Sequence, residues 1–270
     1  MTTTPDITVT VVFHREGAFT IPALDSLVDL IRVARGAGLS VETQAILDQA
    51  DDLTKHIVGV RGAWLDSVEE VSFGDLGLSR NAGTRLARGR FLAFLDGDDL
   101  WGEQWLRAAF DAATAPRSPP DAIWHPETLY YFGESDFDRH SVDNVPHPAA
   151  QSFFMLQHPC DTPGFNPASL ILNNVWSANV LATRELHLRY PYSAIDRHRG
   201  FGIEDWSWHF ETLWEGVPHR VVPNTVHLIR LKDTASLGQQ NVAEGLLPVL
   251  PKSFRWGRKL IPSTLALTSA

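Results

Sequence analysis

Five consecutive apolar residues, Phe91 to Leu95, run directly into the acidic turn Asp96-Gly97-Asp98-Asp99. A short, uninterrupted apolar run predicts a strand that is buried on both faces of a sheet. Three carboxylates at the end of such a strand repel one another unless a cation lies among them. The turn therefore favours a covered sheet with an acidic edge, and oxygen ligands at this spacing suit Mg²⁺ or Mn²⁺. The alternative is a turn in which Asp99 caps the next helix, a role that needs one carboxylate rather than three.

The first 115 residues alternate strands with helices. This alternation predicts a parallel sheet with helices on both faces. Sheets of this kind bind ligands at the carboxyl ends of their strands, where Asp48 and the acidic turn both fall. Besides the apolar run, strands are expected at Ile7–Phe13, Val41–Leu47 and Val68–Phe73, and helices at Pro22–Ala37, Asp51–Val60, Ser79–Arg88 and Leu100–Ala115.

The second half is less regular, and it begins at the Pro-rich joint Ala115–Asp121. We expect residues 1–115 and 116–237 to form two halves of one domain, followed by a C-terminal tail at 238–270. The tail carries a basic patch that either contacts a membrane surface or a partner, or packs on the domain. The expected elements are strands at Ala122–Trp124, Asn174–Val180 and Val221–Leu231, a helix at Ile203–Trp214 and a polar surface loop at Glu134–Pro148; the basic patch is Lys252, Arg255, Arg258 and Lys259.

Composition excludes some classes of function. The 270-residue chain has a formal net charge of −9 and lacks long basic runs, which argues against nucleic-acid binding. Its one cysteine, Cys160, fits a reducing compartment. The N-terminus lacks a signal-peptide pattern, and no stretch reaches the roughly 18 apolar residues of a membrane span. We therefore expect a cytoplasmic protein, with membrane association only through the tail.

Three further groups of residues have the chemistry of a binding or catalytic site. Arg80 follows Ser79 at an expected helix start, which is a ready anion site. Glu204 and Asp205 open another helix, either as ordinary first-turn carboxylates or as a general base in a cleft. Arg230 and Lys232 share one face of the last expected strand, where they serve either as surface charges or as cations for a phosphate.

In this order the motifs resemble the inverting glycosyltransferases of family two, which have the GT-A fold. The resemblance covers about Ile7 to Ser236 and is most specific from Leu78 to Asp99. There a Ser-Arg-Asn-x-Gly helix start, a helix of small residues ending in Gly89 and an apolar strand ending in Asp-x-Asp-Asp occur at the family's spacing. The pair Glu204-Asp205, opening a helix farther along the chain, is the second most specific feature.

The resemblance implies a hexosyltransferase-type enzyme, assisted by Mg²⁺ or Mn²⁺, that works in glycan or surface polysaccharide synthesis. The donor would be a nucleotide-diphosphate sugar, and the acceptor a hydroxyl of a carbohydrate or glycolipid. On the donor side, the resemblance implies that Phe13 and His14 form a wall of the nucleotide pocket, that Asp48 contacts the nucleotide base, and that Arg80 lies near that base or the diphosphate. Asp96 would contact the ribose side, and Asp98 would bind the metal. Asp205 would be the catalytic general base with Glu204 beside it, and the acceptor would be bound by Trp124, His125 and Trp176.

The sequence departs from the family pattern at three places. His14-Arg15-Glu16 stands where many relatives have Pro-Thr-Tyr-Asn, and Asp48-Gln49-Ala50-Asp51 stands where many have Asp-Asp-Gly-Ser. Lys232 occupies the position of a His that is sometimes a metal ligand. A protonated lysine cannot ligate a metal, but it can pair with a diphosphate, so this departure predicts a weaker dependence on metal.

Two other functions stay open at this stage. A nucleotidyltransferase could use the same acidic turn, but the first strand lacks a Gly-rich phosphate loop and the Glu204-Asp205 pair would have no task. A non-catalytic module that binds a sugar nucleotide or a partner fits the altered Asp48 region and Lys232. The presence of Asp96, Asp98 and Asp205 counts against that module.

Overall fold

The structure is a computed structural model that describes residues 4–133, 152–232, 240–241, 243–251 and 253. In these ranges nine strands form one sheet in the order β3-β2-β1-β4-β8-β6-β9-β5, with β7 paired to β6. The four strands of the first half are parallel, as the sequence predicts. They are β1 (Ile7–Phe13), β2 (Val41–Asp48), β3 (Ser67–Val71) and β4 (Phe91–Asp96).

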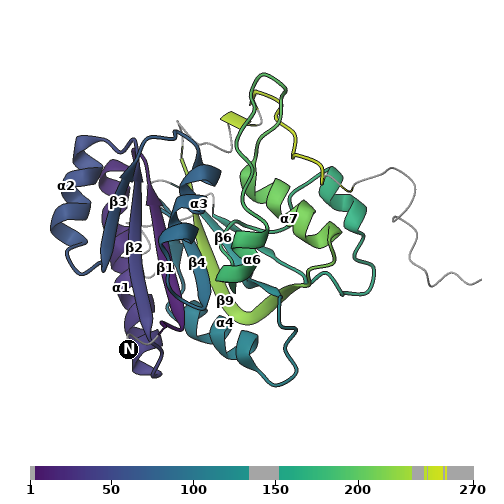
Figure 1. Ribbon diagram of the computed structural model, residues 1–270, viewed down its shortest axis with the longest axis horizontal. Helices are drawn as coiled ribbons and strands as arrows, with labels where there is room; N and C mark the ends of the chain where they lie inside the picture. The colour runs from purple at the N-terminus through teal and green to yellow at the C-terminus, as the bar shows by residue number, and fades with distance from the viewer. Residues whose placement is uncertain (1–3, 134–151, 233–239, 242, 252, 254–270) are drawn as a thin grey trace, which may run out of the picture.

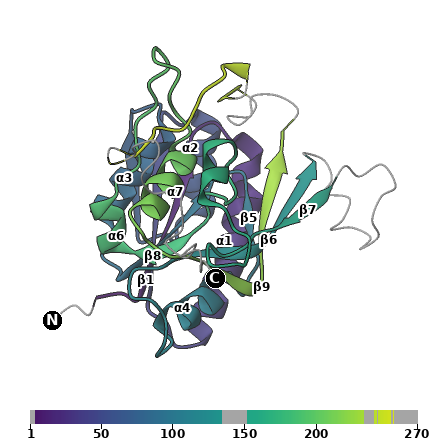
Figure 2. The same cartoon turned by 90° about the vertical axis from the view of Figure 1, so that its right-hand side faces the viewer.

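The second half extends the same sheet and gives it mixed directions. β8 pairs antiparallel with β4 and β6, β9 runs parallel to β6, and β5 and β7 close the far side antiparallel to their neighbours. Figure 2 shows how this side of the sheet turns away from the parallel strands. The bounds are β5 (Leu100–Trp101), β6 (Ile123–Gly133), β7 (Phe153–Leu156), β8 (Leu181–Thr183) and β9 (His219–Leu231).

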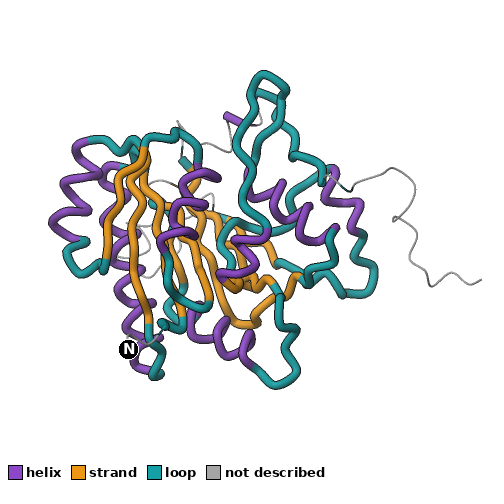
Figure 3. The backbone as a smooth tube through the Cα atoms, viewed as in Figure 1, coloured by secondary structure: helices purple, strands orange, loops and turns teal. Residues whose placement is uncertain are grey.

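Helices cover both faces of the sheet (Figures 1 and 3). One face packs against α1 (Thr20–Gly36), α2 (Asp52–Arg61) and α4 (Trp105–Thr114). The other packs against α3 (Leu76–Leu86), α6 (Arg184–Arg189) and α7 (Glu204–Trp214). Two short 3₁₀ turns are η1 (Gly17–Phe19) and η2 (Pro167–Ile171). No helix in the described ranges is long and apolar enough to span a bilayer.

The apolar side chains of β4 explain why both faces of the sheet must be covered by helices. Phe91, Ala93 and Leu95 belong to the core beneath α1 and α4, whereas Leu92 and Phe94 belong to the core beneath α3 and α7. Successive side chains of a strand point to opposite faces, so an unbroken apolar run requires apolar partners on each side. The prediction made from the apolar run is confirmed, and the acidic turn is fixed at the carboxyl edge of a rigid strand.

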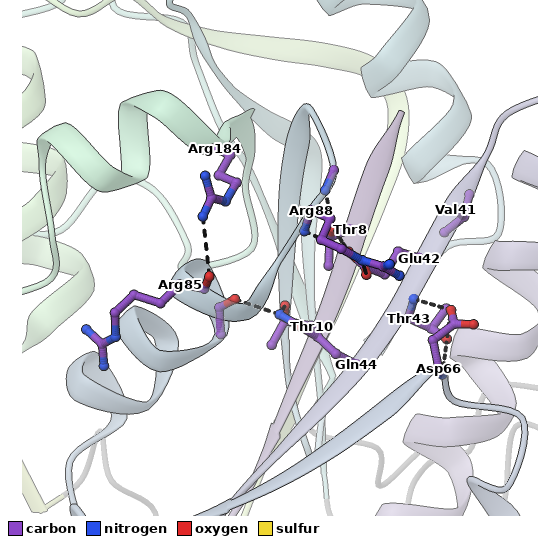
Figure 4. A network of polar contacts seen from close by, with 12 residues as sticks. Thr8, Thr10, Val41, Glu42, Thr43, Gln44, Asp66, Arg85, Arg88 and Arg184 are labelled. Atoms are coloured by element: carbon purple, nitrogen blue, oxygen red, sulfur yellow. Dashed lines mark hydrogen bonds and ion pairs between the residues drawn. The ribbon is translucent and has the colours of Figure 1, made fainter. Parts of the chain in front are cut away.

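Polar contacts fix the position of α3 along the sheet (Figure 4). Gln44 of β2 donates to the Gly83 carbonyl of α3 at 2.7 Å and to Thr10 Oγ1 of β1 at 2.7 Å. Just beyond the C-terminal end of α3, Glu42 accepts a hydrogen bond from the Arg88 backbone amide at 2.8 Å. These contacts hold the C-terminal half of α3 over the middle of β1 and β2 and the amino end of β2, and the N-terminus of α3 lies toward the carboxyl edge of the sheet.

Three expected elements differ from the structure. Leu100 and Trp101 do not begin a helix, because they pair with Leu228 and His227 of β9 and α4 starts only at Trp105. The expected strand at Asn174–Val180 is wrong, and only the residues just after it pair, as β8, with β4. The helix cap at Ser79 is also wrong, because α3 starts three residues earlier. The loop at 134–148 and all four basic residues of the tail patch lie outside the described residues.

Candidate active site

Arg80 joins three elements at the carboxyl edge of the sheet. Its side chain is only 1% exposed. Nη2 lies 2.6 Å from Asp96 Oδ1 at the end of β4, and Nη1 lies 2.6 Å from Glu204 Oε1 at the start of α7. The sequence suggested an anion site at this arginine. The structure instead directs both terminal nitrogens to carboxylates of the protein, so Arg80 holds the acidic turn against α7.

The charges around Arg80 do not balance. Burial alone would lower the pKa of the guanidinium, but Asp96 and Glu204 raise it above its ordinary value. Burial raises the pKa of Glu204 to about 7, with Arg80 opposing and Asp205 adding to the effect. Burial likewise raises the pKa of Asp205, against the opposing effect of Arg80. One cation faces three carboxylates here, and the carboxylates of α7 are therefore stronger bases than ordinary ones.

Asp48 organises the loop that leads into α3. Its Oδ1 accepts hydrogen bonds from the backbone amides of Phe73 and Gly74, at 2.7 and 2.9 Å. Its Oδ2 accepts from the Asp75 amide at 3.0 Å and from Ser79 Oγ at 2.8 Å. These four bonds use the acceptor capacity of a carboxylate. Contact between Asp48 and a nucleotide base stays a prediction, which this arrangement does not support.

Asp75, rather than Ser79, caps α3. Its Oδ1 accepts from the Leu78 amide at 2.9 Å, and its Oδ2 accepts from the Ile195 amide at 2.8 Å. Asn81 exchanges two further hydrogen bonds with the backbone of Tyr192, at 2.8 and 2.9 Å. The start of α3 is thus tied to the segment that precedes α7. Sequence reasoning missed Asp75, although an Asp ahead of the Leu-Gly-Leu-Ser run is the ordinary signal of an N-cap.

Asp205 lies in the first turn of α7 and is partly exposed. The residue just before the helix, Ile203, has a φ of 59°, a left-handed conformation that is uncommon for a branched side chain. Oδ1 of Asp205 accepts from the Trp206 amide at 2.8 Å, and Oδ2 accepts from Asn174 Nδ2 at 2.9 Å. Each oxygen keeps a second lone pair, so the carboxylate is held in place and can still accept a proton.

The three carboxylates of the acidic turn have different partners. Asp96 binds Arg80, and Asp98 Oδ2 lies 2.5 Å from Lys232 Nζ. Asp99 is 6% exposed; it lies 3.0 Å from His227 Nε2 and accepts from the Arg230 amide at 2.9 Å. Asp99 therefore anchors β9 rather than capping a helix. This anchoring holds the turn against the strand that carries Lys232.

Phe13 and His14 lie beside this turn, where β1 ends. A Cβ added to Gly97 would lie 2.3 Å from the Phe13 ring and 2.8 Å from the Val12 carbonyl, so this close approach requires glycine. His14 Nδ1 lies 2.5 Å from the Asp48 carbonyl, and its backbone amide donates to Glu16 at 2.5 Å. Phe13, His14 and Asp48 are thus brought together at one edge, although Phe13 is itself buried.

Glu16 is a residue that sequence reasoning did not assign to the site. Burial, with a further contribution from Asp98, raises its pKa to about 7. Burial and then Asp99 raise the pKa of Asp98 to about 6, with Lys232 opposing. The sequence departs from the family pattern at residues 14–16, which indicates that this part of the site differs from that of relatives. The sequence alone could not predict that Glu16 interacts with Asp98.

The donor atoms at the turn can be tested against a divalent metal. Among the described residues, no group of three or more His, Cys, Asp or Glu side chains could hold a metal ion by itself. Mg²⁺ usually takes one or two protein carboxylates and completes its shell with water and substrate phosphates. Crowded, half-buried carboxylates at Asp98 and Glu16 fit that arrangement. The residues therefore suit a cation shared with a bound diphosphate, with Lys232 as its competitor for Asp98.

The three expected acceptor residues are buried. Trp124 is 9%, His125 0% and Trp176 2% exposed. Trp124 packs in the core of the sheet, and Trp176 stacks on His219 with ring centroids 4.2 Å apart. Both tryptophans thus serve the core, where large aromatic rings contribute strongly to packing. Acceptor binding by these residues stays a prediction, and in this arrangement they offer little ring surface to a ligand.

Known proteins were compared with this chain by sequence and by structure. The profile described as Glycosyl transferase family 2 matches residues 8–167, more than half of the chain. The chain belongs to Glycosyl transferase family 2. The matched region contains β1 to β4 with Asp48, Arg80 and the acidic turn, whereas Glu204 and Asp205 lie beyond it. No curated protein sequence matches the chain significantly.

Two solved structures illustrate the shared fold. S. aureus TarS residues 1–349 in complex with UDP-GlcNAc aligns with a TM-score of 0.58 at 16% identity, over 85% of this chain and 60% of that one. A mannosyltransferase from Pyrobaculum calidifontis in complex with GDP-Man and Mn²⁺ aligns with a TM-score of 0.53 at 16% identity, over 84% and 57%. This chain thus spans about 60% of the TarS structure. The fold is the GT-A fold, as the sequence predicts.

Proposed function

We propose that this protein transfers a hexose from a nucleotide-diphosphate sugar to an acceptor hydroxyl with inversion at the anomeric carbon. The observation that supports the proposal best is the bridge made by Arg80. It joins Asp96 of the acidic turn to Glu204, and Asp205 follows in the same helix turn. A donor bound at the turn would therefore present its anomeric carbon to a site that already contains a carboxylate of raised pKa.

Asp205 is the proposed general base. Asp205 is half-buried and keeps a free lone pair on each carboxylate oxygen, and burial raises its pKa toward the range that suits proton abstraction at neutral pH. It would take the proton of the acceptor hydroxyl as that oxygen attacks opposite the leaving diphosphate. Glu204 is fixed by Arg80 on the acceptor side, and its role is to hold the helix start and its charge in place.

The leaving diphosphate gains negative charge, and cations at the turn would stabilise that charge. Lys232 Nζ lies 2.5 Å from Asp98 Oδ2 and is the protein cation proposed for this task. A divalent metal held by Asp98, when bound, would add Lewis-acid stabilisation of the same oxygens. Support for a metal also comes from the mannosyltransferase of the same fold, whose structure contains GDP-Man and Mn²⁺.

Replacing the base tests the proposal. Asp205→Asn keeps the size and the hydrogen-bonding geometry but cannot accept the proton, so turnover should fall by about 10²–10⁴-fold. Binding of the nucleoside diphosphate, measured by calorimetry, should be unchanged. Asp29→Asn, on the exposed side of α1, is the matched control. Normal transfer or donor hydrolysis by Asp205→Asn would overturn the assignment.

The donor can be identified by thermal stability. A ligand that binds only the native state raises the melting temperature by mass action. UDP, GDP and dTDP would each be measured with and without Mn²⁺. A shift that needs the metal supports a cation at Asp98, and a metal-free shift supports Lys232 as the diphosphate's partner. No shift with any nucleotide would contradict the proposed donor site.

A non-catalytic module of the same fold is the second candidate. It is favoured by the four internal hydrogen bonds of Asp48, which leave that carboxylate occupied by the protein's own loop. Slow release of nucleoside diphosphate from UDP-GlcNAc or GDP-mannose would separate the two, because hydrolysis requires working catalytic groups. Binding without any release, in a protein that also transfers no sugar, would favour the module.

The proposal also covers the acceptor, the location of the protein in the cell and the roles of the two halves of the chain. The acceptor is a carbohydrate or glycolipid in glycan or surface polysaccharide synthesis, and the protein works in the cytoplasm. The segment at 238–270 is the part that would contact a membrane. Residues 1–115 form the donor-binding half, and residues 116–237 form the acceptor half that supplies the base. Both halves contribute strands to one sheet, which agrees with two parts of a single domain.

A further inference from the structure

We infer that Asn174 and His209 are positioning residues that hold the Asp205 carboxylate in the orientation needed to accept a proton, an inference that rests on the proposed function. Asn174 Nδ2 donates to Asp205 Oδ2 at 2.9 Å. On the other side of the same amide, Asn174 Oδ1 lies 3.1 Å from His209 Nδ1. The candidate base is thus the end of a chain of three side chains.

The hydrogen-bond chain has one consistent direction. An ionised carboxylate only accepts, so the amide nitrogen of Asn174 must face Asp205. The amide oxygen must then face His209, which therefore carries its proton on Nδ1. A turned amide would place its oxygen against the carboxylate and lose the bond to Asp205, so the carboxylate fixes the orientation of the amide.

The interior of the protein fixes His209. Its side chain is fully buried, and its ring lies 5.3 Å from the ring of His125 and 5.7 Å from that of His219, centroid to centroid. Burial, and secondarily Arg80, lower the pKa of His209 to about 3, so the ring is neutral. Within the described ranges its Nε2 has no hydrogen-bond partner, which also fits the unprotonated nitrogen of a neutral ring.

A neutral chain suits this task better than a cation. A second arginine at Asp205 would favour the ionised form strongly and weaken the base. An amide donor orients the carboxylate while adding no net charge. The charged or titratable groups that face Asp205 from the elements around it are Arg80 of α3, Asp96 of β4, Glu204 of α7, Tyr131 of β6 and Tyr192 of the segment before α7.

Asn174→Leu is the first test, because leucine has nearly the same size but cannot donate. Hydrolysis of UDP-GlcNAc and GDP-mannose would be followed as a function of pH. We expect a loss of roughly 10–100-fold in kcat, the size of effect expected from a misplaced reacting group. The acid limb of the pH–rate profile should move to higher pH, because the lost hydrogen bond favoured the ionised carboxylate. Asn173→Leu, at the exposed neighbouring position, is the control.

A pair of variants at His209 tests the second link. His209→Phe keeps a ring in the core but removes the Nδ1 donor, and it should reproduce the effect of Asn174→Leu on kcat and on the acid limb. His209→Asn places an amide nitrogen near the original Nδ1 and should restore both at least in part. If Asn174→Leu fails to fold, as judged by its melting curve, this pair decides the question.

Asp205→Asn separates failure of the inference from failure of the proposed function. If Asp205→Asn hydrolyses donor at the normal rate, the proposed function itself fails. If Asp205→Asn is inactive while Asn174→Leu and His209→Phe keep both the normal kcat and the normal acid limb, only the positioning role is overturned. A fall in kcat with an unmoved acid limb, and with no rescue by His209→Asn, would also overturn it, since general loosening of the fold has that result.

Discussion

Arg80 Nη1 lies 2.6 Å from Glu204 Oε1, although the two residues are 124 positions apart in the chain. The contact is buried on both sides, at 1% and 5% side-chain exposure. It brings the start of α3 against the start of α7, and through Asp96 it also reaches the end of β4. The geometry of the candidate active site therefore depends on one guanidinium that can bind two carboxylates at once.

Arg80→Lys should destabilise the protein, because a lysine amine cannot reach both carboxylates in the same fork. Removing one partner from a buried ion pair costs about 3–5 kcal/mol, and at least one carboxylate loses its partner here. Urea unfolding would measure the difference. Arg85→Lys, on the exposed side of the same helix, should change little. Equal unfolding midpoints for the two variants would contradict the bridging role.

Glu204 should make stability depend on pH. Its pKa in the folded protein is about 7, above the ordinary value of 4.5. Between pH 4.5 and 7, Glu204 therefore binds more protons in the folded state than in the unfolded state. The free energy of unfolding should then fall as pH rises through this window, by at most about 1.4 kcal/mol per pH unit. Glu204→Gln should make this dependence on pH weaker. Part of the dependence should remain in that variant, because the pKa of Asp205 is also raised. Urea curves at pH 5, 6 and 7 test this, with Glu185→Gln as an exposed control; an unchanged slope would count against it.

Asp48→Asn should loosen the loop before α3. An amide in place of one oxygen presents a donor to groups that are themselves donors, and buried groups left unsatisfied cost about 1–3 kcal/mol. Faster hydrogen exchange should appear at the amides of Phe73, Gly74 and Asp75, which the carboxylate now binds. Asp25→Asn, at an exposed position, serves as control. If protection at residues 73–75 is unaltered while nucleotide affinity falls, Asp48 acts on the base and not on the loop.

Lys232→Ala should increase dependence on metal. The ammonium group lies 2.5 Å from Asp98, and a metal at Asp98 would have to compete with it. Without the lysine, Mn²⁺ alone should bind more tightly, and metal-free binding of UDP or GDP should weaken by roughly tenfold, the size expected for one charge-assisted hydrogen bond. Calorimetry with EDTA and with Mn²⁺ measures both effects, and Lys55→Ala on α2 is the control. Unchanged affinities under both conditions would remove Lys232 from the site.

Sequence reasoning was most successful where the signal is local. The unbroken apolar run at Phe91–Leu95 requires cover on both faces of a strand, and β4 has that cover. β1 matches the β-branched stretch that predicted it, residue for residue. The same approach failed at Asn174–Val180 and at Leu100, because strand pairing depends on which distant segment supplies the partner.

The motifs pointed to residues that the structure brings to one edge of the sheet, but they did not predict which side chains those residues contact. Asp96, Asp98, Glu204 and Asp205 were named from their motifs, whereas their partners come from elsewhere in the chain. The sequence suggested an anion site at Arg80, because residue spacing does not show which carboxylates lie beside it in the folded protein. Glu16 and His209 had no motif at all, since their importance comes only from what lies beside them in the folded protein.

The distribution of partners along the chain has a consequence for how the protein is made. β1 contacts β2 across 34 positions, but Asp99 finds His227 only across 128. At synthesis rates of about 5–20 residues per second, the acidic turn leaves the ribosome roughly ten seconds before the strand that completes it. During that interval the parallel half can already assemble from near neighbours, while Asp98 and Asp99 still lack their lysine and histidine. The parallel half can thus take shape first, but its acidic edge is completed only when β9 has been made.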